Sequence, residues 1–125
     1  MAEAYAFYEA AFGHAIVLES RADLVPHSHS ESQIAFWLGG TRAQAQVGDE
    51  LVQYDQDTGL ATNAYQSHDM TLQDGKGPAV FLVFMISRQW LNERRKSTGQ
   101  RFVFPSPRIP IDLALRQACW RVLDL

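Results

Sequence analysis

The chain has 125 residues, of which 46% are hydrophobic and 11% aromatic, so it is long and apolar enough to form one folded domain and is not a disordered segment. Its net charge of −3 and its pI of about 5.7 argue against a nucleic-acid-binding surface on this segment. The single cysteine cannot form an internal disulfide, and no run approaches the roughly 20 apolar residues that cross a bilayer. The start of the chain lacks a secretory signal. Together these features predict a cytoplasmic domain without membrane contact.

The first predicted element is a short amphipathic helix over residues 3–12. Three aromatic residues follow helical spacing there: Tyr5, Tyr8 and Phe12. Strands are expected over residues 15–20 and 33–38. One face of the second strand carries three large apolar side chains, Ile34, Phe36 and Leu38. That face needs cover from the N-terminal helix, a C-terminal helix or a partner subunit.

Four further strands are expected between turn-forming glycine, aspartate and proline residues, over residues 43–47, 50–55, 60–64 and 70–73. Residues 79–86 are an unbroken apolar run, which is typical of a strand buried on both faces. Short strands every eight to twelve residues or so, with turn signals between them, predict a mainly β, antiparallel sandwich or barrel.

A helix is predicted over residues 88–97, because Ser87 can cap its start and Gly99 can close its end. Its last turn is basic, with Arg94, Arg95 and Lys96. These cations either contact phosphate or DNA, or simply complement the helix dipole at a solvated end, and we favour the second interpretation.

A final helix is expected from Pro110 to the end of the chain, after an extended connector over residues 104–108. Five residues at steps of 4, 3, 4 and 3 form a narrow apolar seam of the coiled-coil kind, predicted to be a dimer interface: Ile111, Leu115, Ala118, Val122 and Leu125. A plain core helix is the alternative, because Leu113, Cys119 and Leu123 can widen the apolar face. The last residues contain no stop signal, so we expect the natural chain to continue.

The candidate functional site is centred on His27, His29 and Gln33. On an extended strand alternate side chains point the same way, so these three would share one face. His68 is a second arm further along the chain. Three imidazoles and one amide oxygen make a plausible divalent-metal or small-molecule site. The alternative is an exposed pair of histidines in a polar loop, since residues 26–32 are also turn-like in composition.

The four predicted donors are all neutral, so a divalent ion bound by them would keep its full formal charge. Imidazoles favour Zn, Ni, Cu or Fe over Mg or Ca. Three aromatic residues are candidates for lining a ligand pocket, although packing alone also explains each of them: Trp37, Tyr54 and Tyr65. Cys119 is expected in the core rather than as a nucleophile, and His14, which follows a glycine at a turn, is assigned no role.

The string His27-x-His29-x-x-x-Gln33, ending at Gly40 and followed by His68 as a later arm, resembles the two motifs of the cupin superfamily. In that pattern the position of Gln33 is usually Glu. Combined with residues 62–70 and 80–93, the order of the motifs resembles the N-terminal sensor domain of AraC-type transcription regulators, over roughly residues 15–125.

This resemblance implies a cupin-like antiparallel double-sheet β-barrel of the jelly-roll type over residues 1–104, including a short helix at 87–98. A linker and C-terminal dimerisation helix would follow over residues 105–125. It further implies a small-molecule effector inside the barrel, with or without a metal, and a homodimer. DNA would be bound only by a helix-turn-helix half beyond Leu125.

Two other functions stay open on the sequence. One is a stand-alone metal-dependent cupin enzyme, such as a dioxygenase or isomerase. The other is an interaction domain with an empty barrel. Gln33 in place of a carboxylate and the unfinished C-terminal helix both favour the sensor over the enzyme.

Overall fold

The computed structural model of the chain describes residues 2–121. The strands within this range are β1 (Ala2–Ala10), β2 (Gly13–Ser20), β3 (Leu24–His27), β4 (Ser32–Gly40), β5 (Ala43–Val47), β6 (Glu50–Gln53), β7 (Thr58–Thr62), β8 (His68–Leu72), β9 (Ala79–Ile86) and β10 (Arg108–Pro110). The helical elements are the single 3-10 turn η1 (Gln73–Gly75) and the α-helices α1 (Arg88–Thr98) and α2 (Leu113–Arg121).

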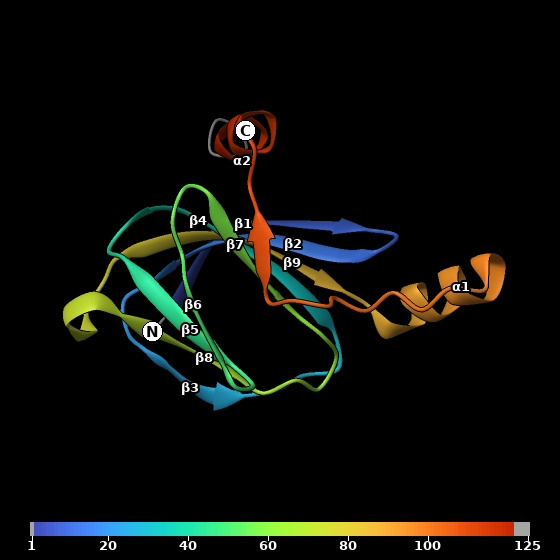
Figure 1. The fold of residues 1–125 in the computed structure, drawn as a ribbon. Coiled ribbons are helices and arrows are strands. Elements are labelled where there is room, and N and C mark those ends of the chain that lie inside the picture. The colour runs from blue at the N-terminus through green and yellow to red at the C-terminus, as the bar shows by residue number, and fades with distance from the viewer. Residues whose placement is uncertain (1, 122–125) are drawn as a thin grey trace.

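The strands form two antiparallel sheets that face each other (Figure 1). The larger sheet has the order β1-β2-β9-β4-β7-β10, and the smaller has the order β3-β8-β5-β6. The main core lies between them and takes residues from both, among them Leu60, Phe81, Ala45 and Val52. The predicted mainly β, antiparallel, double-sheet architecture is therefore confirmed. The predicted strands are found within two residues of their expected ends.

Strand β9 confirms the expectation of a strand buried on both faces. It pairs along its length with β2 on one side and β4 on the other. Phe81 and Val83 belong to the core between the sheets, whereas Leu82 belongs to a second apolar cluster on the opposite side of the larger sheet. Because both faces are covered, the strand shows no alternation of polar and apolar residues.

The outer face of β4 is covered by the C-terminal part of the same chain. Phe36 and Leu38 are buried in the second cluster together with Ile111 and Cys119, and Leu115 packs against it half-buried. Of the three covers considered for this face, the C-terminal helix is the one that the structure shows. This placement also puts Cys119 in the core, as predicted.

The predicted N-terminal helix is wrong, because residues 2–10 form strand β1. This strand pairs antiparallel with β2 from Ala2 opposite Ser20 to Ala10 opposite Gly13, with one irregularity between Ala4 and Ala6. Backbone groups on the outer edge of β2 gain hydrogen-bond partners in this way. Aromatic residues also favour strands, so tertiary pairing overrides a helical spacing that spans only ten residues or so.

The final helix begins later than predicted. Residues Arg108–Pro110 form strand β10, which pairs with β7, since prolines hold the flanking backbone extended. Helix α2 starts at Leu113, where the Asp112 carboxylate accepts a hydrogen bond of 2.8 Å from the Leu115 backbone N–H.

Helix α1 has the predicted caps. The Ser87 hydroxyl oxygen accepts a hydrogen bond of 3.0 Å from the Trp90 backbone N–H, and Gly99 adopts a left-handed conformation at its end. The helix buries no residue and extends away from the sheets (Figure 1). Within residues 2–121, no helix is long and apolar enough to cross a membrane.

Candidate metal centre and ligand cavity

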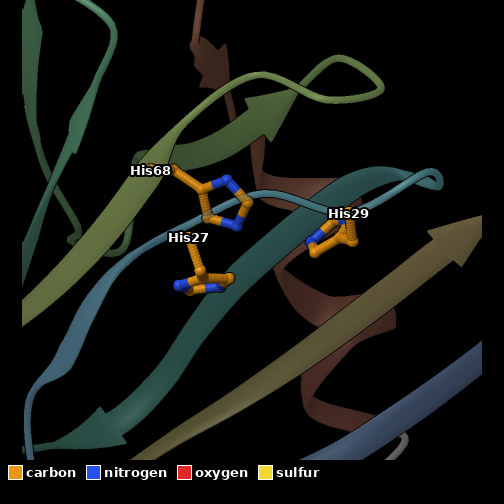
Figure 2. Close-up of side chains that lie close together, drawn as sticks. All are labelled: His27, His29 and His68. Carbon is orange, nitrogen blue, oxygen red and sulfur yellow. The ribbon is translucent and has the colours of Figure 1, made fainter.

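Three imidazoles converge at one end of the space between the sheets. His27 ends β3, His29 follows in the loop, and His68 begins β8, directly opposite His27 in the strand pairing. One ring nitrogen from each lies within 4.8 Å of those of the other two. The ring centroids of His27 and His68 are 4.3 Å apart, and those of His29 and His68 are 4.9 Å apart. Figure 2 shows the three rings turned toward one common region.

The convergence does not arise in the way the sequence suggested. His27, His29 and Gln33 do not share one strand face, because β3 ends at His27 and Gln33 lies on β4 in the other sheet. The chain turns between the two strands, and the backbone carbonyl of His29 accepts a hydrogen bond of 2.7 Å from the Tyr65 N–H. This turn brings the Gln33 Oε1 atom to 3.0 Å from His29 Nε2.

A backbone carbonyl fixes the orientation of each imidazole. The Nδ1 atoms of His27, His29 and His68 lie 2.8, 2.9 and 2.9 Å from the carbonyl oxygens of Val25, Glu31 and Gln66. A carbonyl can only accept, so Nδ1–H donates and the lone pair of the neutral ring is on Nε2. Metal-binding histidines characteristically hold the other ring nitrogen in this way.

The Nε2 atom of His68 supplies the clearest sign of a missing ligand. It is buried and has no hydrogen-bond partner among residues 2–121. An unpaired buried polar atom costs roughly 1–3 kcal/mol, so a folded protein normally satisfies it with an ion, a ligand or water. The residues present therefore fit a divalent metal of the kind that takes imidazole ligands.

Gln33 is the candidate for a fourth ligand, because its Oε1 atom lies beside His29 Nε2. With Nδ1–H of His29 donating, its Nε2 and the Gln33 Oε1 are both acceptors, and at 3.0 Å they would repel each other. A shared cation would remove the conflict, because both lone pairs would then face a positive charge. Without an ion, the amide gains a hydrogen bond by turning its NH₂ group toward His29.

Burial lowers the pKa of His68, because the charged ring would lose its hydration. The neighbouring His27 and His29 act in the same direction, whereas the Gln66 carbonyl and Asp69 oppose the shift. The ring is therefore neutral near pH 7, with its lone pair available.

The metal-free protein is expected to lose stability as the pH is lowered below 6.5, the ordinary pKa of histidine. The unfolded chain takes up a proton at residue 68 in that range, whereas the folded chain takes it up only at a lower pH. The stability that comes from keeping His68 neutral is therefore fully present above pH 6.5 and is lost on acidification. Urea unfolding in EDTA at pH 7.5, 6.5 and 5.5 measures it, and His68→Gln should flatten the profile. A His68→Gln profile as steep as that of the wild type would contradict this assignment.

The imidazoles stand at the polar end of a cavity of about 280 Å³ between the sheets. Apart from its polar end, the lining is mostly apolar and includes Leu60, Met70 and Phe81. A larger hollow of about 410 Å³ on the smaller sheet is lined mainly by polar side chains such as Gln44 and Gln53. The histidines belong to the smaller cavity, which is therefore the candidate ligand site.

Of the three predicted pocket aromatics, only Tyr54 lines this cavity. Trp37 belongs to the same face of β4 as Gln33, but its indole N–H donates to the Thr41 carbonyl at 3.1 Å and the Arg42 guanidinium lies over its ring. Tyr65 is 60% exposed and its ring faces Arg88. Neither of these two is a lining residue, because local contacts turn each side chain elsewhere.

His14, to which the sequence analysis assigned no role, is a lining residue. It pairs with Met85 on β9, which in turn pairs with Gln33 on β4. The pairing of residues 15–20 with 79–86 would have shown that His14 lies beside the cavity. One sequence alone does not predict that pairing.

Part of the predicted dimer interface packs inside the chain instead. Ile111 is buried and Leu115 is half-buried against the outer face of the larger sheet, which supports the core-helix interpretation for both. Ala118 is exposed, and Val122 and Leu125 lie outside the described residues. The side of α2 that faces solvent carries Leu113 and Trp120. Dimerisation stays a prediction.

No protein-family model and no curated protein matches the chain. Solved structures do. AerE from Microcystis aeruginosa matches with a TM-score of 0.68 and 13% identity, over 89% of this chain and 48% of its own. The cupin domain of Cnp3 from Schizosaccharomyces pombe matches with a TM-score of 0.56 and 14% identity, over 84% of this chain and 74% of its own.

The fold is a cupin fold. At these identities the likeness shows the fold alone, and the chain spans only 48% of AerE. In this cupin-fold chain the three-histidine cluster can bind a metal.

Proposed function

We propose that the chain is the effector-sensing domain of an AraC-type transcription regulator. His27, His29, His68 and Gln33 hold a divalent transition metal, and this metal anchors a small molecule in the cavity. The observation that carries the proposal is the orphaned Nε2 of His68, directed among two further imidazoles at the polar end of an otherwise apolar cavity.

The donor set favours binding over catalysis. All four proposed ligands are neutral, and Asp69, the one carboxylate among the described residues that line the cavity, accepts a hydrogen bond of 2.7 Å from the Gln46 N–H on the neighbouring strand. The order of the sequence motifs from Val25 to Glu93 supports the regulator in particular. Such regulators bind DNA through a separate helix-turn-helix half, which the resemblance places C-terminal to α2.

Strand β4 offers a route from the ligand to the rest of a regulator. Gln33 is near its start on the inner face, and Phe36 is on its outer face beneath α2. A ligand that shifts Gln33 relative to the histidines moves a strand on which α2 rests. Effector binding would thereby bias the placement of α2, which is the differential contact that a two-state switch requires.

The first test is metal uptake followed by a reporter measurement. Purified protein is expected to bind close to one equivalent of Zn²⁺ or Ni²⁺ by calorimetry and elemental analysis. Residues 1–125 are then fused ahead of a DNA-binding half that occupies its operator only as a dimer. Operator occupancy should change when metal is added or removed by EDTA, and His29→Ala should abolish this response. Occupancy that is indifferent to metal would contradict the sensor.

A metal-dependent cupin enzyme is the second candidate. Three histidines and one amide would leave positions free for a substrate on an ion that takes more than four ligands, and metal catalysis needs such positions. The enzyme predicts that a compound bound by the metal-loaded protein is recovered chemically changed. The sensor predicts that it is recovered unchanged, and mass spectrometry of the released compound distinguishes them.

A further inference from the structure

The inner face of the larger sheet is arranged in rows of directly paired residues, because β2, β9, β4 and β7 lie in register. The row nearest the histidines is His14, Met85, Gln33 and Thr62. The next row is Ile16, Val83, Ala35 and Leu60. Side chains two residues apart on a strand share a face. His14 and Gln33 of the first row and all four residues of the second row line the cavity, so its lining changes from partly polar to apolar between adjacent rows.

The smaller sheet repeats this change. His68 begins β8 at the polar end, and Met70, on the same face two residues later, lines the apolar part. The buried Tyr54 places the edge of its ring against Phe81, with ring centroids 5.1 Å apart. Burial raises the pKa of Tyr54, so its hydroxyl stays protonated and adds no charge. A ligand in this cavity therefore has a polar head at one end and an apolar body.

The charge of the head follows from the ligands of the metal. Four neutral donors supply none of the negative charge that would balance a divalent ion in this partly buried site. Among the described residues that line the cavity, Asp69 carries the only carboxylate, and its single negative charge offsets at most one of the two positive charges of the ion. An anionic head on the ligand supplies the missing charge, which a neutral alcohol or amide would not.

We propose that the ligand is a small amphiphilic carboxylate. Its carboxylate faces the metal, and its alkyl or aryl body lies along the row of Val83, Ala35 and Leu60. This inference rests on the proposed metal site. Sugars and other polyols are disfavoured, because each hydroxyl buried in the apolar rows without a partner costs affinity. The cavity has a volume of about 280 Å³, so the length of the body that it accepts is limited.

The test is a calorimetric titration of the Zn²⁺-loaded protein with straight-chain carboxylates from butanoate to dodecanoate. Affinity should rise roughly fourfold for each added methylene until the apolar part of the cavity is filled, and then level off. Alcohols of the same length should bind at least about tenfold more weakly, and glucose should not bind measurably. Removal of zinc should weaken the carboxylates and leave the alcohols unchanged.

Two variants of the apolar row locate the body of the ligand. Ala35→Val narrows the cavity at the apolar row and should move the plateau to a shorter carboxylate, whereas Val83→Ala widens it and should move the plateau to a longer one. Neither residue is a metal ligand, so zinc uptake should stay at one equivalent in both. If Ala35→Val does not fold, Val83→Ala still tests whether the body of the ligand lies along this row.

The outcomes separate the two proposals. Zinc uptake combined with a flat chain-length series, or with equal binding of alcohols, overturns the amphiphilic carboxylate and leaves the metal centre intact. A chain-length plateau that neither variant moves also overturns it. Failure to take up zinc overturns both the metal centre and the ligand class that rests on it.

Discussion

Replacing His68 by alanine is expected to lower the affinity of the protein for Zn²⁺ by at least about 100-fold. Loss of a residue that merely orients a ligand already costs roughly 10–100-fold, so loss of the ligand itself costs more. His68 is also the most buried of the three histidines, and its Nε2 has no other partner within residues 2–121. Competition titration against a chromophoric zinc chelator at pH 7.5 measures the effect.

His14→Ala is the matched control for this experiment. His14 lines the same cavity, but it lies on β2 and is not a member of the three-histidine cluster. Its removal should leave zinc affinity within about threefold of the wild type. Equal losses in both variants would mean that the effect reflects general disturbance of the cavity, and the assignment of His68 as a ligand would fail.

The sequence predicted the strands well where turn residues delimit them. Strands β5 and β9 have the predicted ends, because Gly48 follows one and Pro78 precedes the other. Residues 3–12 were predicted wrongly, since a short aromatic pattern fits a helix and a strand alike, and pairing with β2 decides between them. Local periodicity does not reveal such long-range pairing.

The sequence predicted which residues come together at the candidate site, but not which strands carry them. His27, His29, Gln33 and His68 do come together, yet the expected single strand is instead two strands in different sheets joined by a turn. The family resemblance named residues that the structure brings together, whereas the argument that they alternate along one strand was wrong, because β3 and β4 belong to different sheets. His14 was missed because its place beside the cavity depends on the register of β2 against β9.

Leu115→Asp is expected to lower the free energy of unfolding by about 2–4 kcal/mol. Leu115 packs half-buried against the apolar cluster that contains Phe36 and Cys119. The substitution removes apolar contact and places a charge where hydration is incomplete. Urea denaturation at pH 7.5, followed by tryptophan fluorescence and circular dichroism, measures the loss.

Leu113→Asp provides the comparison, since it makes the same chemical change two residues earlier in the first turn of the same helix. Any gain from an aspartate near the helix N-terminus is common to both variants and cancels between them. Leu113 is 63% exposed, so this variant should change stability by no more than about 0.5 kcal/mol. Equal stability of the two variants would contradict the packing of α2 on the larger sheet.

The same pair of variants tests how subunits associate. If two copies pair through α2, the side of the helix that faces solvent, with Leu113 and Trp120, is the side available to a partner. Leu113→Asp should then shift a dimer to monomer in sedimentation without loss of fold, whereas Leu115→Asp should act mainly through stability. A monomeric wild-type protein at high micromolar concentration would exclude pairing through this helix in residues 1–125. The seam of Ile111 and Leu115 would then serve only to hold α2 over β4.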